Sequence, residues 1–108
     1  GGDGDALDVL VLSQHSATQT VLEVMPIALL NLIDNGEIDS KIIAVPINPN
    51  HRVITAASYS ELHSEYPNVQ RLIELWFTSY KGSGIVEFNG WGNELSAKRE
   101  IEKWLVPN

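Results

Sequence analysis

The sequence predicts a domain of the α+β class, in which helices pack on a mostly antiparallel β-sheet. Short apolar segments typical of strands fill the first half of the 108-residue chain, and amphipathic helical patterns dominate the second half. The pair Asn35-Gly36 separates two strand-like segments, and both residue types tolerate a positive φ. A tight hairpin is therefore expected at this pair.

The strands are expected mainly before the first helical pattern. Residues 7–12 form a near-continuous apolar run, which is typical of a strand that is covered on both faces. Further strands are expected at residues 21–25, 27–33, 40–47 and 85–88. Pro26 separates the second strand from the third, because proline cannot donate a hydrogen bond to a neighbouring strand.

Two helices and one helical turn are expected in the second half. An apolar stripe recurs at helical spacing at Val69, Leu72, Ile73, Trp76, Phe77 and Tyr80. Pro67 before this stripe and Gly82 after it suit the start and the end of a helix. A helical turn is expected at residues 59–65, and a last helix at residues 93–105 with Asn93 as its N-cap. We expect Trp76 and Trp104 to lie in the core.

Length and composition exclude several classes of protein. Residues 1–108 are expected to form a single domain with one modest core, since 44% of the residues are hydrophobic. No apolar run approaches the roughly 20 residues that span a bilayer, so no membrane partner is expected. The chain has no cysteine, which suits the cytoplasm. A net charge of −7 argues against nucleic acid as a partner, because phosphate contacts need clustered Lys and Arg.

The aspartates are confined to two groups in the first third of the chain. They are Asp3, Asp5, Asp8, Asp34 and Asp39. Short carboxylates at two positions are typical of a site for a hard cation such as Mg²⁺, and one that holds no metal could take a proton from a metal-bound water. The alternative is that these residues cap helices and start turns.

The predicted hairpin brings the second group together. If its turn has four residues, Asp34 and Asp39 are direct cross-strand neighbours with Cβ atoms roughly 4.5–5.5 Å apart. Two like charges in such positions destabilise a sheet unless a cation or a shared proton lies between them. Lys41 projects from the same face as Asp39, because strand side chains alternate. This lysine is explained either by a simple salt bridge or as a phosphate ligand beside a metal.

Four stretches of the sequence resemble the soluble, Mg²⁺-dependent inorganic pyrophosphatases of the barrel-fold family. They are DGDALDVLVL, IDNGEIDSKIIAVP, FTSYK and GWG, in this order. The family signature D-[SGDN]-D-P-x-D-[LIVMF] is matched at residues 3–9, where Ala6 replaces the proline, and Asn35 stands where the family usually has a second acid. The resemblance covers essentially the whole chain. It implies a partial antiparallel β-barrel with two packed helices.

The resemblance also implies an activity and a role for each site residue. The activity is hydrolysis of inorganic pyrophosphate to two phosphates by a metal-activated water, with Mg²⁺ as the cofactor. The implied metal ligands are Asp3, Asp8, Asp34 and Asp39, and the implied general base is Asp5. The implied ligands of the phosphate groups are Lys41, Tyr80 and Lys81. Lys81 could instead have a purely structural role as a cation at a helix C-terminus. Tyr80 could likewise be the last core residue of the apolar stripe.

Members of this family carry a segment before the aspartate signature, with further glutamates, a lysine, an arginine and a strand similar to YPxNYG. The sequence given starts at the signature, so we expect it to represent the C-terminal portion of the fold, with weak or no turnover alone. An incomplete barrel exposes strand edges, so we also expect a homo-oligomer. The alternative is a truncated, non-catalytic paralogue that serves as a metal-binding, phosphate-binding or oligomerisation module.

Overall fold

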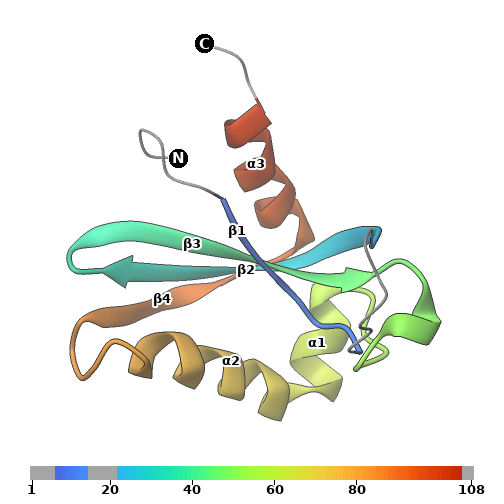
Figure 1. Ribbon diagram of the computed structural model, residues 1–108, viewed down its shortest axis with the longest axis horizontal. Helices are drawn as coiled ribbons and strands as arrows, with labels where there is room; N and C mark the ends of the chain where they lie inside the picture. Colours follow the sequence, from blue (N-terminus) through green and yellow to red (C-terminus); the bar gives the residue numbers. More distant parts are fainter. Residues whose placement is uncertain (1–6, 15–21, 106–108) are drawn as a thin grey trace.

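The computed structural model describes residues 7–14 and 22–105, and a four-stranded sheet lies at its centre (Figure 1). Its strands are β1 (Asp8–Val11), β2 (Val24–Asp34), β3 (Glu37–Pro46) and β4 (Val86–Gly92), in the order β1-β3-β2-β4. β2 pairs antiparallel with both β3 and β4, whereas β1 pairs parallel with β3. The predicted α+β class and partial barrel are confirmed, because the sheet formed by the described residues is mixed and does not close.

The long hairpin of β2 and β3 turns at the predicted pair Asn35-Gly36, whose φ angles are 53° and 83°. The turn has two residues, not four, so Asp34 lies opposite Glu37. Asp39 lies opposite Leu32. The prediction that Asp34 and Asp39 are direct cross-strand neighbours is therefore wrong. Their side chains still share one face of the sheet, because Asp39 projects to the same side as its partner Leu32, and Leu32 is two residues from Asp34 on β2.

The predicted break at Pro26 is also wrong. Residues 24–34 form one continuous strand, and the pairing with β3 shifts between Pro26 and Ala28. Such an irregularity lets a strand accommodate a residue that has no N–H donor, because one position is left out of the hydrogen-bond ladder. β4 likewise runs to Gly92, beyond the predicted end at residue 88.

The helices cover both faces of the sheet. They are the short 3₁₀ helix η1 (Pro49–His51), α1 (Tyr59–Glu65), α2 (Pro67–Ser79) and α3 (Glu94–Leu105). The side chain of Asn93 accepts a hydrogen bond from the backbone N–H of Ser96, so the predicted N-cap of α3 is confirmed. Figure 1 shows α1 and α2 on one side of the sheet and α3 on the other. None of the helices in the described part of the chain has the length and apolar composition to cross a membrane.

The larger core fills the space between the sheet and the pair α1 and α2. There Leu30, Leu32 and Ile43 of the strands pack with Leu62 of α1 and Ile73 of α2. A smaller cluster fixes α3 to the opposite face of the sheet. It contains Leu29, Ile42 and Ala97, with Leu7 and Ile101 packed at its rim.

The apolar stripe of α2 is wider than the face that packs. Val69, Ile73 and Phe77 contact the larger core. Trp76 is 66% exposed, so the expectation that it lies in the core is wrong. Trp104 of α3 is half-buried. Periodicity alone did not distinguish the packed face of α2 from its flank, because both carry large apolar residues.

Candidate active site

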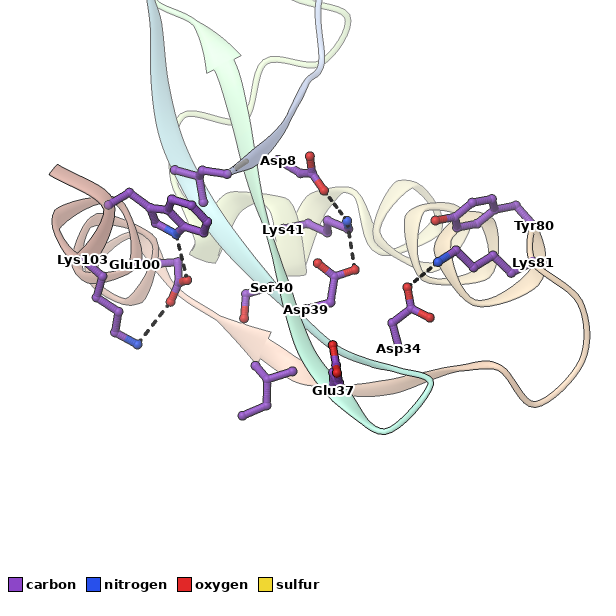
Figure 2. Close-up of a pocket in the computed structure, with 13 residues that line it drawn as sticks. Asp8, Asp34, Glu37, Asp39, Ser40, Lys41, Tyr80, Lys81, Glu100 and Lys103 are labelled. Atoms are coloured by element: carbon purple, nitrogen blue, oxygen red, sulfur yellow. Dashed lines mark hydrogen bonds and ion pairs between the residues drawn. The ribbon is translucent and has the colours of Figure 1, made fainter. Parts of the chain in front are cut away.

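A pocket of about 710 Å³ lies where the turn end of the hairpin meets the start of β1 and the ends of α2 and α3 (Figure 2). Its lining residues are Leu7, Asp8, Asp34, Glu37, Ile38, Asp39, Ser40, Lys41, Tyr80, Lys81, Glu100, Lys103 and Trp104. Six of the residues predicted for the site are among them: Asp8, Asp34, Asp39, Lys41, Tyr80 and Lys81. The predicted ligand Asp3 and the predicted base Asp5 lie outside the described residues.

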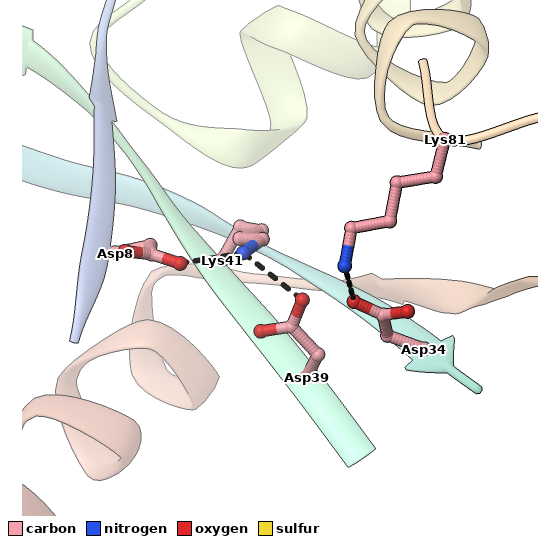
Figure 3. Close-up of polar contacts among 5 residues, drawn as sticks. All are labelled: Asp8, Asp34, Asp39, Lys41 and Lys81. Atoms are coloured by element: carbon pink, nitrogen blue, oxygen red, sulfur yellow. Dashed lines mark hydrogen bonds and ion pairs between the residues drawn. The ribbon is translucent and has the colours of Figure 1, made fainter. Parts of the chain in front are cut away.

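The parallel pairing of β1 with β3 brings Asp8, the described member of the first group of aspartates, to the second group. This pairing places Asp8 beside Lys41, so both side chains project from the same face. The Lys41 Nζ atom donates to Asp8 Oδ2 at 2.5 Å and lies 3.0 Å from Asp39 Oδ2 (Figure 3). One ammonium group therefore binds carboxylates that lie far apart in the sequence.

Lys41 is largely removed from solvent, unlike its partners. Its side chain is 8% exposed, whereas the side chain of Asp8 is 58% exposed. The Lys41 Nζ atom also lies 5.7 Å from the centre of the Phe77 ring, within the range of a cation–π contact. Burial lowers the pKa of Lys41, but hydrogen bonds and attraction from Asp8 and Asp39 outweigh it, so the pKa is raised. The ammonium form is thus favoured at neutral pH.

A second ion pair closes the other end of the pocket. Lys81 Nζ donates to Asp34 Oδ2 at 2.5 Å, and this hydrogen bond raises the pKa of Lys81. Tyr80 is the C-cap of α2 and exposes its ring to the pocket, with Lys81 Nζ 5.9 Å from the ring centre. The C-terminal end of α2 is in this way fixed to the turn end of the hairpin.

The third wall of the pocket, from α3, was not predicted as part of the site. Lys103 Nζ lies 3.3 Å from Glu100 Oε1, and the Trp104 indole N–H donates to Glu100 Oε2 at 3.4 Å. Helical spacing already places these three residues on adjacent turns of the predicted last helix. The sequence carried no signal that this helix meets the hairpin turn, because that depends on how α3 crosses the sheet.

The described carboxylates suit a hard divalent cation. Asp8 and Asp39 aim their oxygens at one position, which the Lys41 ammonium occupies (Figure 3). Carboxylate oxygens are the ligands that Mg²⁺ takes, usually one or two of them together with water and substrate oxygens. Within residues 7–14 and 22–105, no three His, Cys, Asp or Glu side chains gather into a set that could hold a metal by themselves. The donor chemistry therefore fits Mg²⁺, with two carboxylates at one cation position.

Comparisons with known proteins identify relatives along the whole described fold. A family model described as inorganic pyrophosphatase matches residues 1–106. The inorganic pyrophosphatase of Haemophilus influenzae is 34% identical over 105 residues, which are 94% of this chain and 58% of that protein. The inorganic pyrophosphatase of Saccharolobus solfataricus is 36% identical over 108 residues, with 94% of this chain and 60% of that protein covered.

Solved structures agree with the sequence relatives. A crystal structure of an inorganic pyrophosphatase from Neisseria gonorrhoeae superposes with a TM-score of 0.73 at 30% identity, over 92% of this chain and 58% of that one. A structure named inorganic phosphatase from Anaplasma phagocytophilum gives a TM-score of 0.75 at 30% identity, over 94% and 60%. The chain thus spans about 60% of the length of each of these four proteins.

Proposed function

Because the chain belongs to the inorganic pyrophosphatase family, we propose that the protein hydrolyses inorganic pyrophosphate to two phosphate ions, with Mg²⁺ as its cofactor. The observation that best supports this activity is one pocket in which Lys41 and Lys81 each pair with carboxylates. Such a pocket offers both acceptors for a cation and donors for phosphate oxygens. Phosphoryl transfer depends mostly on this kind of positioning and charge neutralisation.

The charge balance of the pocket explains why the substrate needs a cation. Among the described residues, five carboxylates line it against three ammonium groups, and this excess of negative charge repels a multiply charged anion. The carboxylates belong to Asp8, Asp34, Glu37, Asp39 and Glu100, and the ammonium groups to Lys41, Lys81 and Lys103. Divalent cations on the carboxylates reverse this balance locally.

The residues predicted for the site then divide into two sets, of which the first acts on the metal and the attacking water. Asp8, Asp34 and Asp39, together with Asp3 from the resemblance, would hold Mg²⁺. When bound, Mg²⁺ lowers the pKa of an attacking water and neutralises phosphate oxygens. Asp5 would accept the proton of that water.

The second set of predicted site residues would bind the substrate. Lys41, Tyr80 and Lys81 would donate hydrogen bonds to phosphate oxygens, from positions set by β3 and by the end of α2. The two lysines would also neutralise charge on the phosphates. Tyr80 would contribute a neutral donor, which orients the substrate without changing the charge balance.

This activity is proposed for the complete family fold, and this chain covers about 60% of the length of the two sequence relatives named above. We propose a weak activity for the 108-residue chain alone, a cytoplasmic location and a homo-oligomer. The exposed apolar side chains of Leu72 and Trp76 on α2 favour association. A non-catalytic module that binds metal or phosphate is the alternative.

A phosphate-release assay with pyrophosphate and Mg²⁺ tests the proposal. We expect release that EDTA abolishes and that Asp8→Asn lowers by about a hundredfold, a typical cost of removing one electrostatic contact from a reacting phosphate. Glu87→Gln, which changes an exposed carboxylate on β4 outside the pocket, serves as the matched control. Mg²⁺ binding without any phosphate release would favour the non-catalytic alternative, and full activity of Asp8→Asn would contradict the proposed site.

A further inference from the structure

We infer that the ammonium groups of Lys41 and Lys81 act as internal countercations of the carboxylates. A divalent cation must displace these ammonium groups from the carboxylates before the two lysines can bind an anion. The inference rests on the proposed function and deepens it, because it sets an order of binding: the divalent cation first and the phosphate-bearing anion second. Neither lysine would then be a ready anion ligand in the metal-free protein.

The first step of the argument is that Lys41 already occupies a cation position. Its Nζ atom lies 2.5 Å from Asp8 Oδ2 and 3.0 Å from Asp39 Oδ2, so both carboxylates are directed at the same point. Figure 3 shows the ammonium group between the two carboxylates. A divalent cation that uses these two oxygens must take the place of the ammonium group.

The second step is that the Lys41 ammonium group cannot bind the two carboxylates and a phosphate group at the same time. An ammonium group has three N–H donors and no acceptor. Asp8 and Asp39 take up two of these directions for Lys41, and the Phe77 ring lies 5.7 Å away on a further side. A phosphate oxygen at this ammonium would have to lie against two carboxylates of like charge. The anion therefore has access to Lys41 only after the carboxylates have found another cation.

The third step is that the displaced Lys41 stays in the pocket. Its backbone is held in β3 between Asp8 of β1 and Leu30 of β2, and the residue is 7% exposed. The face of the Phe77 ring offers the freed ammonium a nearby contact. Lys41 can thus exchange carboxylate partners for phosphate oxygens by a side-chain movement alone.

Lys81 repeats the arrangement in a more exposed form. Its side chain is 42% exposed, and Asp34 is its one carboxylate partner among the residues that the structure describes. Water screens an exposed pair, so its contribution is small. Displacement of Lys81 should therefore oppose cation binding less than displacement of Lys41 does.

Calorimetric titration of Mg²⁺ into the 108-residue chain measures this competition directly. We expect Lys41→Met to bind Mg²⁺ about three- to tenfold more tightly than the wild type, and Lys81→Met to show a smaller gain in the same direction. Lys103→Met is the matched control. It also removes a positive charge from the pocket, but Lys103 pairs with Glu100, which is not one of the proposed metal ligands. Its Mg²⁺ affinity should rise less than that of Lys41→Met, because only the general charge of the pocket changes.

A second measurement keeps the inference testable if Lys41→Met fails to fold. NMR signals of the lysine side-chain CH₂ groups next to Nζ are followed in the wild-type chain during Mg²⁺ titration. Signals of Lys41 and Lys81 should move and saturate together with metal binding, while those of Lys103 should not. Inorganic phosphate, used as the anion probe, should move the Lys41 signal only when Mg²⁺ is present.

Several results would overturn the inference. They are a wild-type chain that binds no Mg²⁺, unchanged Mg²⁺ affinity in both Lys41→Met and Lys81→Met, an equal gain in Lys103→Met, or phosphate binding at Lys41 without metal. Turnover is an independent readout. If the chain releases phosphate but the lysine variants bind Mg²⁺ as the wild type does, the inference is rejected and the proposed function stands. If the variants show the expected gains in Mg²⁺ affinity but the chain releases no phosphate, the inference stands and the proposed function is rejected.

Discussion

The β2–β3 hairpin has two halves that share one hydrogen-bond ladder but have opposite surroundings. In the half far from the turn, residues 41–46 of β3 and residues 27–30 of β2 are all buried. In the turn half, Glu37 and Ile38 are exposed, and the half-buried carboxylates of Asp34 and Asp39 line the pocket. One half holds the fold together and the other presents the charges of the candidate site.

Lys41 marks the boundary between these halves. It is the first of the six consecutive buried residues at the end of β3, and its ammonium reaches back to Asp39 in the turn half. The apolar half therefore does more than stabilise the protein, because it fixes the place from which the charged half is organised. The comparison predicts that mutations in the two halves have separable effects on stability.

The largest effect should come from removing apolar volume in the buried half. Ile43 is fully buried in the larger core, so Ile43→Ala should lower the free energy of unfolding by about 3 kcal/mol through lost burial and the cavity left behind. Ile38 lies on the same strand and is 83% exposed, so Ile38→Ala should change the free energy of unfolding by less than about 0.5 kcal/mol. Urea denaturation followed by circular dichroism measures both. Equal losses would refute the distinction between the halves.

A smaller effect is expected at the turn itself. Gly36 has a φ of 83°, and a Cβ atom placed there would meet nothing within 4 Å. Gly36→Ala should therefore lower the free energy of unfolding by about 1 kcal/mol through backbone strain alone. Gly36→Asn should cost less, since asparagine tolerates this conformation better. Thermal denaturation of the two variants tests this order, and a larger loss for the Asn variant would contradict the explanation.

The smallest effect should be the dependence of stability on alkaline pH at the boundary between the halves. The pKa of Lys41 is raised above its ordinary value of 10.5, so the folded state holds this proton more tightly than the unfolded state does. Its pairing therefore contributes fully below about pH 10.5 and is lost as the pH rises through the raised pKa. The stability difference between wild type and Lys41→Met should shrink over this range. Urea denaturation at a series of pH values would show a constant difference if the pairing contributed nothing.

Local features of the fold could be predicted because short-range chemistry determines them. The hairpin turn follows from Asn35-Gly36, and the start of α3 follows from the capping chemistry of Asn93. The aspartates stood out in the sequence because they occur in only two groups. The family resemblance implied that residues of both groups share one site, and Asp8 and Asp39 do meet at Lys41.

Features that depend on tertiary context could not be predicted in the same way. The irregularity after Pro26 keeps β2 continuous, and it depends on pairing with β3. The turn of two residues rather than four changed which residues face Asp34 and Asp39. Trp76 looks like a core residue by spacing, yet no described element covers it. The wall of the pocket that α3 provides depends on a helix crossing angle, which no local pattern encodes.

The three indole side chains of this chain lie in three different settings. Trp76 is open to solvent on α2, Trp91 donates a 2.7 Å hydrogen bond to Glu74 between β4 and α2, and Trp104 lines the pocket. Their intrinsic fluorescence therefore contains a reporter of the exposed α2 surface, a reporter of global unfolding and a reporter of pocket occupancy. Single-tryptophan variants would separate these three emissions, so that ligand entry could be followed optically without attaching a dye.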